Sequence, residues 1–497
     1  MSIKRNILAN YASQAYVTLA MLVMLPLYLK YMGAEAYGLV GFFTMLNAFF
    51  MLLDVGLSPT LSRETARYQG GAIDAPTLRG LVRILELIFI SVAVLAAIGF
   101  VFASDFFAGQ WLKVEHLPLN EVQYALILMG LTIPLRWMSG LYRGAVNGFE
   151  RQVWLAGFNI LIATARFVGI LVVFELIDTT PTTFFSYQLV IAVLELSGLA
   201  WMTYRLLPEQ TATQTLSQAW QSLKGTLRFS LAIAFTGAVW VLVTQVDKLV
   251  LSRMLTLSDY GYFTLAVVVA GGVNLIGAPI TQALQPRLTR LISEGNEAEA
   301  ITLYRKATQL VTILAAPAAL TLAAFAAPVM WAWTGNPVAV EKAAPVLVLY
   351  AIGNGLLALV GLSYALQYAK GDLRLHLIGN AVLLVFMVPC LIWAASRWGA
   401  MGAGWTWLVS IGLYLLLWVP KIHERMSLGL HIPWLMRDVL PIITATIVLC
   451  TGIIFYQFTI ASRMESGLLA IGSGIFMLFA AGSMSTVARN FILRILK

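Results

Sequence analysis

The chain has few charged residues. Of its 497 residues, 11% are charged and 60% are hydrophobic, whereas about a quarter of the residues in an average soluble domain carry a charge. The apolar residues also occur in blocks of about 20, the length of helix that crosses a hydrocarbon core of roughly 30 Å. This composition excludes a water-soluble enzyme and predicts a membrane protein with many spans.

Residues that build disulfides and metal sites are also scarce. The two cysteines, Cys390 and Cys450, both lie within apolar runs, so the sequence predicts neither a disulfide framework nor a metal site. The four histidines are scattered and form no catalytic group with acidic residues. They are His116, His376, His423 and His431. We therefore expect no catalytic residue and no cofactor.

Long hydrophilic segments and a nucleotide-binding motif are missing. The longest predicted external connection, residues 104–122, has only about 20 residues, and the cytoplasmic connections at 58–80, 206–228 and 284–307 are slightly longer. None is long enough to fold as a separate catalytic domain. A G-x-x-x-x-G-K-[ST] phosphate loop is absent. These absences exclude a self-contained ATP-driven pump and favour a secondary-type transporter, which is not an enzyme.

The apolar blocks predict about fourteen transmembrane helices. Helices are expected because lipid-exposed backbone must satisfy its own hydrogen bonds, and the blocks are far longer than the strands of a barrel. The first block is expected to be a retained span, because no convincing cleavage site follows it. The predicted spans are residues 7–29, 37–57, 81–103, 122–144, 154–176, 184–205, 229–251, 261–283, 308–333, 345–366, 376–396, 402–420, 438–459 and 467–488.

The distribution of basic residues predicts the orientation. The formal net charge of +9 would suggest nucleic acid as a partner of a soluble protein, but the positive-inside rule explains it better here. If the N-terminus is cytoplasmic, most Lys and Arg residues lie near cytoplasmic helix ends, and the opposite topology would invert this bias. We therefore predict that both termini are cytoplasmic and that nucleic acid is not a partner.

The sequence contains a sparse internal repeat with an offset of 223 residues. Transporters are commonly built from such repeats, with the substrate path between the copies. The repeat predicts an N-lobe at 1–206 with six spans, a cytoplasmic linker at 207–228, a C-lobe at 229–420 with six spans, and two further spans with a tail at 421–497. The aligned pairs are Lys30 with Arg253, Tyr37-Gly38 with Tyr260-Gly261, Arg67 with Arg290, Gly148 with Gly371, and Arg151 with Arg374.

Three charged residues lie deep within predicted spans, where a charge is costly and indicates function. Arg166 and Glu195 are near the middles of their spans, and Arg136 is several turns from an interface. The two arginines either form a structural ion pair with Glu195 or Asp54, or line a water-filled cationic cavity. Such a cavity suits an anionic substrate, because the guanidinium fork engages phosphate oxygens in pairs.

Other charges lie closer to the predicted span ends. Asp54 is one turn from the cytoplasmic end of its span, and Asp247 is close to the external end of span seven. Together with Glu195, these carboxylates either hold a coupling proton or sodium ion or balance charge. Four residues are expected to extend toward an interface, and the two basic ones are secondary candidates for the cavity. They are Glu86, Arg143, Glu175 and Lys248.

Four motifs together resemble the polysaccharide-transport family of the multidrug/oligosaccharidyl-lipid/polysaccharide exporter superfamily, which includes the bacterial O-antigen flippases. Their order and spacing carry the likeness, which extends from Asn6 to the fourteenth predicted helix. The motifs are "LPLYLKYMGAEAYGLVGFF", "LLDVGLSPTLSRETAR", "GLYRGAVNGFERQ" and "VDKLVLSRMLTLSDYGYF".

The resemblance implies an all-α membrane protein with two six-helix lobes around a central cavity and two C-terminal helices. It implies ion-coupled alternating access that moves an oligosaccharide on undecaprenyl pyrophosphate, such as an O-antigen unit for lipopolysaccharide, across the bacterial inner membrane. Arg136 and Arg166 match the basic positions tied to the pyrophosphate, and Asp54 and Asp247 match acidic positions in spans two and seven. Membrane lipids and the polysaccharide polymerase or chain-length machinery are the implied partners.

Three alternatives stay open at this point. A multidrug cation antiporter of the same superfamily as a rule has twelve spans, and its substrates favour an acidic cavity. The lipid II flippases resemble one another in a basic cluster in the first helix, whereas this chain has no Lys or Arg between Arg5 and Lys30. A polysaccharide polymerase or O-antigen ligase would carry a large external loop, which this sequence lacks.

Overall fold

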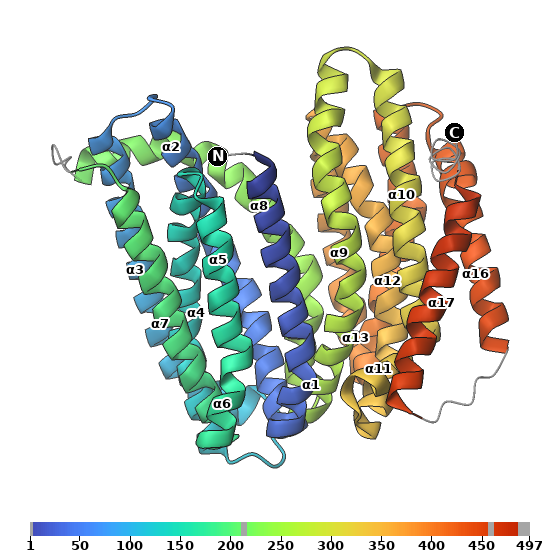
Figure 1. Cartoon of the computed structure of the whole chain (residues 1–497), viewed down its shortest axis with the longest axis horizontal. Coiled ribbons are helices and arrows are strands. Elements are labelled where there is room, and N and C mark those ends of the chain that lie inside the picture. The colour runs from blue at the N-terminus through green and yellow to red at the C-terminus, as the bar shows by residue number, and fades with distance from the viewer. Residues whose placement is uncertain (1–2, 210–215, 456–461, 486–497) are drawn as a thin grey trace. The chain divides into compact units, whose positions relative to one another are not determined.

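The computed structural model describes residues 3–209, 216–455 and 462–485, which are almost entirely helical (Figure 1). The α-helices are α1 (Ile3–Phe50), α2 (Leu57–Gln69), α3 (Ala75–Phe106), α4 (Leu119–Gly148), α5 (Gln152–Ala163), α6 (Gly169–Leu176), α7 (Pro181–Leu206), α8 (Leu216–Met254), α9 (Leu257–Ser293), α10 (Glu297–Ala324), α11 (Ala326–Thr334), α12 (Pro337–Lys370), α13 (Arg374–Leu413), α14 (Val419–Met426), α15 (His431–Pro433), α16 (Leu440–Phe455) and α17 (Arg463–Met484). Tighter or wider turns are η1 (Met51–Asp54), η2 (Phe107–Trp111), η3 (Thr164–Val168), η4 (Tyr414–Trp418) and η5 (Trp434–Val439).

Eleven helices among the described residues are long and apolar enough to cross a membrane. Two of them contain a glycine whose backbone dihedral angles are not helical. These are Gly33, with φ 82° and ψ 170°, and Gly399, with φ 56° and ψ −132°. Each glycine lies between two predicted spans, 7–29 and 37–57 in the first case and 376–396 and 402–420 in the second. The predicted all-α membrane fold is confirmed, and the count of fourteen spans stays a prediction.

The chain divides into two compact units, Met1–Gly261 and Tyr262–Lys497. Helix α8 begins at Leu216, so part of the segment expected to be a cytoplasmic linker is helical. The lobe boundaries predicted from the repeat remain predictions.

Helix α4 is the central element of the first unit and packs against α2, α3 and α7. Its glycines at positions 140, 144 and 148 form a small-residue stripe of the kind that lets membrane helices approach closely. A Cβ atom on Gly144 would lie 2.5 Å from the carbonyl oxygen of Ser58, and one on Gly148 would lie 2.3 Å from that of Ser62. The stripe lets α2 pack closely against α4. From the sequence, this segment was placed in a cytoplasmic connection, so the helix was not predicted.

In the second unit, α10 packs against α12, α16 and α17. The core between these helices is built from fully buried residues that include Tyr304, Leu362 and Trp434. The last two predicted spans therefore pack onto the helices of this unit through α10.

The repeat positions occupy equivalent places in the two halves of the sequence. Arg67 and Arg290 lie in the last turns of α2 and α9. Two further matched pairs, Gly148 with Gly371 and Arg151 with Arg374, lie at the short turns that follow α4 and α12. The sparse identity thus marks the ends of corresponding helices.

The substitution Gly144→Ala is expected to lower the free energy of unfolding by about 1–3 kcal/mol, because the new methyl group would overlap backbone atoms of α2 that cannot rotate aside. Thermal unfolding of the purified protein in detergent measures this loss. Gly157→Ala is the matched control, since a Cβ there meets nothing within 4 Å. Equal stability of the two variants would contradict the close α2–α4 contact.

Candidate functional site

The carboxylate of Glu195 on α7 binds two arginines from different helices. Its Oε1 atom accepts a hydrogen bond of 2.7 Å from Arg143 on α4, and its Oε2 atom accepts one from Arg166 in η3. The Glu195 side chain is 8% exposed, whereas the Arg143 and Arg166 side chains are 33% and 20% exposed. One buried anion is therefore shared between two partly accessible cations.

Arg136 joins this cluster through an amide instead of a carboxylate. Its Nη2 donates to Oε1 of Gln188 at 2.6 Å, and its guanidinium carbon lies 4.8 Å from the ring centre of Phe43. The Nε2 atom of Gln188 donates in turn to the backbone carbonyl of Arg166 at 3.3 Å. Gln188 thus connects the third arginine to the other two.

The helical register places these partners together. Arg136 and Arg143 are seven residues apart on α4, and Gln188 and Glu195 are seven apart on α7. Residues at this spacing lie on one face of a helix. Both pairs have the same sequence separation, 52 residues, so the two helices run parallel and form a two-step polar ladder.

Arg166 lies in η3, a π-helical turn that separates α5 from α6. Such turns disturb the regular backbone pairing and occur frequently at functional sites. The three successive carbonyls of residues 165–167 all accept side-chain hydrogen bonds, from Tyr187 at 2.6 Å, from Gln188 at 3.3 Å and from Tyr28 at 2.8 Å. The backbone that carries Arg166 is therefore held from three sides.

The cluster carries excess positive charge. Within the part of the chain that the structure describes, the three guanidinium groups have Glu195 as their only ion-pair partner. The Nε atoms of Arg136 and Arg166 are also buried and have no hydrogen-bond acceptor there. Three cations, one carboxylate and two unused donors make this an arrangement suited to an anionic ligand.

A cavity of about 190 Å³ lies beside Arg136. It is smaller than the roughly 300–1,000 Å³ of typical ligand pockets, so it fits a headgroup fragment and not a whole oligosaccharide. The lining is mostly apolar, apart from the guanidinium and one amide. The lining residues are Asn47, Ala48, Phe50, Met51, Ile133, Arg136 and Trp137.

The other acidic candidates have different surroundings. Oδ1 of Asp54 accepts hydrogen bonds from the backbone nitrogen of Ser58 at 3.1 Å and from its hydroxyl at 2.6 Å, which anchors the first turn of α2. Asp247 is 5% exposed and lies 3.3 Å from Nζ of Lys248. That lysine also donates to the carbonyl of Thr244 at 2.7 Å. The roles predicted for these residues remain predictions.

Two further charged residues within predicted spans bind side chains on neighbouring helices. Glu86 is 9% exposed and accepts hydrogen bonds of 2.8 Å from Tyr142 and from Tyr204. Arg143 is held by Glu195 and also donates to Asn159. Position within a span gave no reason to expect these contacts, because they depend on the neighbouring helices. The shared spacing of seven residues was the one signal in the sequence that could have linked Arg143 to the cluster.

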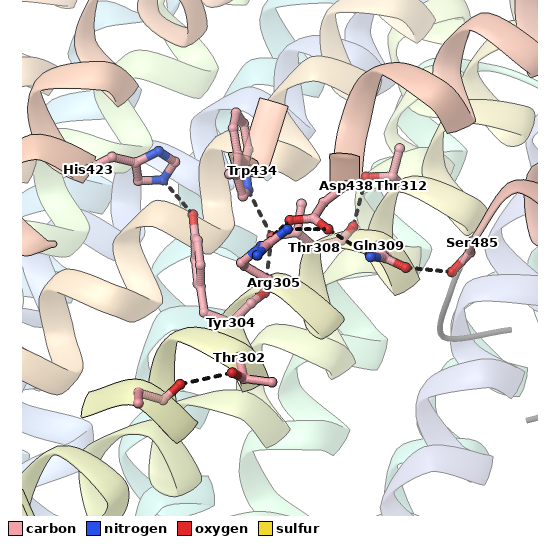
Figure 2. Close-up of polar contacts among 11 residues, drawn as sticks. Thr302, Tyr304, Arg305, Thr308, Gln309, Thr312, His423, Trp434, Asp438 and Ser485 are labelled. Atoms are coloured by element: carbon pink, nitrogen blue, oxygen red, sulfur yellow. Dashed lines mark hydrogen bonds and ion pairs between the residues drawn. The ribbon is translucent and has the colours of Figure 1, made fainter. Parts of the chain in front are cut away.

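A second polar network lies in the other unit and was missed by the sequence analysis (Figure 2). Nε of Arg305 on α10 lies 2.6 Å from Oδ2 of Asp438 in η5, which is 1% exposed. Gln309 donates to the same carboxylate at 2.7 Å and accepts from Ser485 at 2.8 Å. This network pairs one cation with one anion, so it braces α10 against η5 and the end of α17 without excess charge.

Two of the four histidines, which had been predicted to be scattered, meet beside this network. Nδ1 of His423 lies 3.1 Å from Nδ1 of His431. Nε2 of His423 lies 2.8 Å from the hydroxyl of Tyr304 (Figure 2). No group of three His, Cys, Asp or Glu side chains suited to a metal ion occurs among the described residues. The histidine pair holds the turn after α14 against α10.

The sequence profile of a family described as "Polysaccharide biosynthesis protein" matches residues 3–292. No curated protein sequence matches the chain. Solved structures are similar in fold, at sequence identities too low to carry function.

Three of these structures illustrate the similarity. Lipid II flippase MurJ in an inward closed conformation has a TM-score of 0.73 at 14% identity, over 99% of this chain and 100% of that one. An inward-facing multidrug resistance MATE transporter has a TM-score of 0.64 at 15% identity, over 84% and 96%. A transporter of the MOP superfamily from Pyrococcus furiosus has a TM-score of 0.51 at 15% identity, over 84% and 97%. The chain therefore has the fold of these transporters.

Glu195→Gln is expected to lower the free energy of unfolding by about 3 kcal/mol, because it leaves two guanidinium groups without their buried anion. Thermal unfolding in detergent tests this expectation. The control is Glu294→Gln. Glu294 pairs with Arg290, and both side chains are exposed to solvent, so this ion pair should contribute less than about 1 kcal/mol to the free energy of unfolding. If the two substitutions have equal effects, the shared ion pair does not stabilise the fold.

Proposed function

The chain belongs to the polysaccharide biosynthesis protein family, and on that premise we propose that it is a flippase for an oligosaccharide linked to undecaprenyl pyrophosphate. The substrate, an O-antigen unit or another surface-polysaccharide repeat, enters from the cytoplasmic leaflet of the bacterial inner membrane. The protein delivers it to the periplasmic leaflet by ion-coupled alternating access. No ATP-binding motif is present, so an ion gradient of H⁺ or Na⁺ supplies the energy.

The single observation that supports this proposal best is the imbalance of charge at Glu195. Three arginines from predicted spans lie in one cluster with a single carboxylate: Arg143 and Arg166 bind Glu195, and Arg136 is connected to them through Gln188. Burying an uncompensated cation in a membrane protein is costly unless a partner or water reaches it. A diphosphate group supplies the missing negative charge, and its oxygens are acceptors only, which matches the unused Nε–H donors of Arg136 and Arg166.

Arg136 is the first contact of the phosphate in this proposal. It is bound to the neutral Gln188, so an incoming anion need not displace a carboxylate. The adjoining cavity places apolar side chains such as Phe50 and Ile133 beside the guanidinium. This combination fits a phosphate that is attached to a hydrocarbon chain. Arg166 then completes the diphosphate site, while Arg143 keeps Glu195 neutralised.

The acidic residues have the remaining roles in the proposal. Glu195 balances charge and orients Arg166. Asp54 and Asp247 are the candidates for the coupling ion, and Lys248 is the counter-charge of Asp247. The polysaccharide polymerase and chain-length machinery receive the product on the periplasmic side.

The charge of the cluster also separates this proposal from its alternatives. A site with three arginines and one carboxylate repels cationic drugs, which disfavours a multidrug cation antiporter. A lipid II flippase moves a related diphosphate lipid, and the similarity in fold to MurJ is compatible with it. The absence of Lys and Arg between Arg5 and Lys30 favours a different glycan.

Arg136→Gln and Arg166→Gln are each expected to weaken binding of undecaprenyl pyrophosphate by about 10- to 100-fold, since each charge-assisted contact contributes about 1.5–3 kcal/mol. Export of surface polysaccharide in cells should be lost while the protein stays in the membrane. Binding to the purified protein and export are both measured. The control is Arg205→Gln, whose guanidinium lies over the exposed ring of Trp201.

Normal binding and export in both variants would refute the cationic site. Loss of the protein from the membrane would instead show that these arginines are structural. Lipid II, offered as a competing ligand in the same binding assay, decides between the two diphosphate lipids, because the proposed substrate should bind more tightly.

The predicted topology has a separate test. Green fluorescent protein fused after Lys497 should fluoresce, because this reporter folds in the cytoplasm, and alkaline phosphatase fused at the same place should be inactive. An active phosphatase fusion would show that the C-terminus is periplasmic, so that the predicted orientation and the proposed direction of transport are both reversed.

A further inference from the structure

The repeat brings its two copies into direct contact at one point of the first unit. Ala34 and Leu257 are separated by the repeat offset of 223 residues, and so are Gly38 and Gly261. A Cβ atom on Gly38 would lie 2.1 Å from the carbonyl oxygen of Leu257, and one on Gly261 would lie 2.5 Å from that of Ala34. Each glycine therefore contacts the residue four positions before the other. Such reciprocity is the signature of a two-fold axis.

The backbone bends at equivalent positions on both sides of this contact. In the first copy α1 is interrupted at Gly33, and in the second copy α8 ends at Met254 and α9 begins at Leu257. The tyrosines that precede the two glycines, Tyr37 and Tyr260, are 2% and 0% exposed. The crossing of residues 34–38 with residues 257–261 is thus a close backbone contact flanked by buried aromatic rings.

A short loop straps the crossing together. The buried carboxylate of Glu35 accepts hydrogen bonds from the backbone amides of residues 115–117, at 2.5, 3.0 and 3.1 Å. The carbonyl of Lys113 in the same loop accepts from the amide of Leu257 at 2.9 Å, and its Nζ donates to the carbonyl of Met254 at 2.8 Å. The loop therefore binds the first copy through Glu35 and the second copy through Lys113.

We infer that this crossing, which we term the glycine seal (residues 34–38 and 257–261), closes the external end of the transport path and separates when the protein opens outward. In the predicted topology both segments lie at the external side. Inverted or parallel repeats commonly rock against each other during transport. A contact made by backbone and glycine can part without repacking interdigitated side chains, and the strap of hydrogen bonds sets how readily it does so.

The inference rests on the proposed transport cycle but not on the identity of the substrate. Its test accordingly uses no substrate. Ser252 is 2% exposed beside the seal and accepts a hydrogen bond from Trp111 at 3.0 Å, so Ser252→Cys reports opening. In a background with Cys390→Ser and Cys450→Ser, a membrane-impermeant maleimide added outside intact cells measures the rate of labelling.

Gly38→Ala is expected to raise the labelling rate of the reporter about 5- to 150-fold, because the methyl group collides with backbone and overpacking of about 1–3 kcal/mol shifts the equilibrium by that factor. Gly261→Ala should act alike, since its contact is the reciprocal one. Gly99→Ala is the matched control, with nothing within 4 Å of its Cβ position. Unchanged labelling in both seal variants would overturn the inference.

Global unfolding is distinguished with a second reporter. Thr132 on α4 is fully buried, and Thr132→Cys should stay unlabelled in every variant that is folded. If the Thr132→Cys reporter becomes labelled in the glycine variants, these variants are unfolded and the test uses Glu35→Gln in their place. This change weakens the hydrogen bonds of the strap without adding volume. Faster labelling at position 252 alone then supports the seal, and unchanged labelling rejects it. If the seal opens while Arg136→Gln still exports normally, the proposed substrate site fails and the seal stands.

Discussion

A guanidinium group cannot give up its proton within a bilayer, so the protein must supply it with partners. Most of the contacts that position the candidate site provide such partners for three arginines. Glu195 neutralises two of them, Gln188 holds the third, and the π-helical turn at residues 164–168 has its carbonyls bound by side chains from α1 and α7. The charge that remains after this pairing makes the site a candidate for an anion.

The two polar networks of the chain differ in this respect. Arg305 and Asp438 pair one to one, and Gln309 and Ser485 complete the network, so nothing there calls for a ligand. The cluster at Glu195 leaves positive charge and two donors unused. Buried polar groups without partners are expensive in a low-dielectric interior. A protein that keeps them gains a site that an anion can complete.

Predictions from the sequence succeeded where a single helix decides the outcome. Apolar blocks of span length predicted the helices, and the breaks at Gly33 and Gly399 lie between predicted spans. The family resemblance is confirmed by the profile match. Predictions were weaker where two helices decide the outcome together. Arg143 and Glu86 were expected near an interface, and the contacts that bury or pair them come from α7 and α4. The helix α2 was not predicted because its apolar face is buried only where it packs against the glycine stripe of α4, and that contact is not visible in the segment by itself.

By itself the sequence determined that this chain is a helical membrane protein with arginines in its spans and a repeat of 223 residues, because hydrophobic length and spacing are properties of one segment at a time. Tertiary structure alone decided which carboxylate each arginine meets, that Gly38 and Gly261 contact each other's helices, and that His423 and His431 are neighbours. These outcomes depend on the rotation and register of helices that are distant in sequence. A side chain carries its charge from the start, but it acquires partners only when the surrounding helices pack.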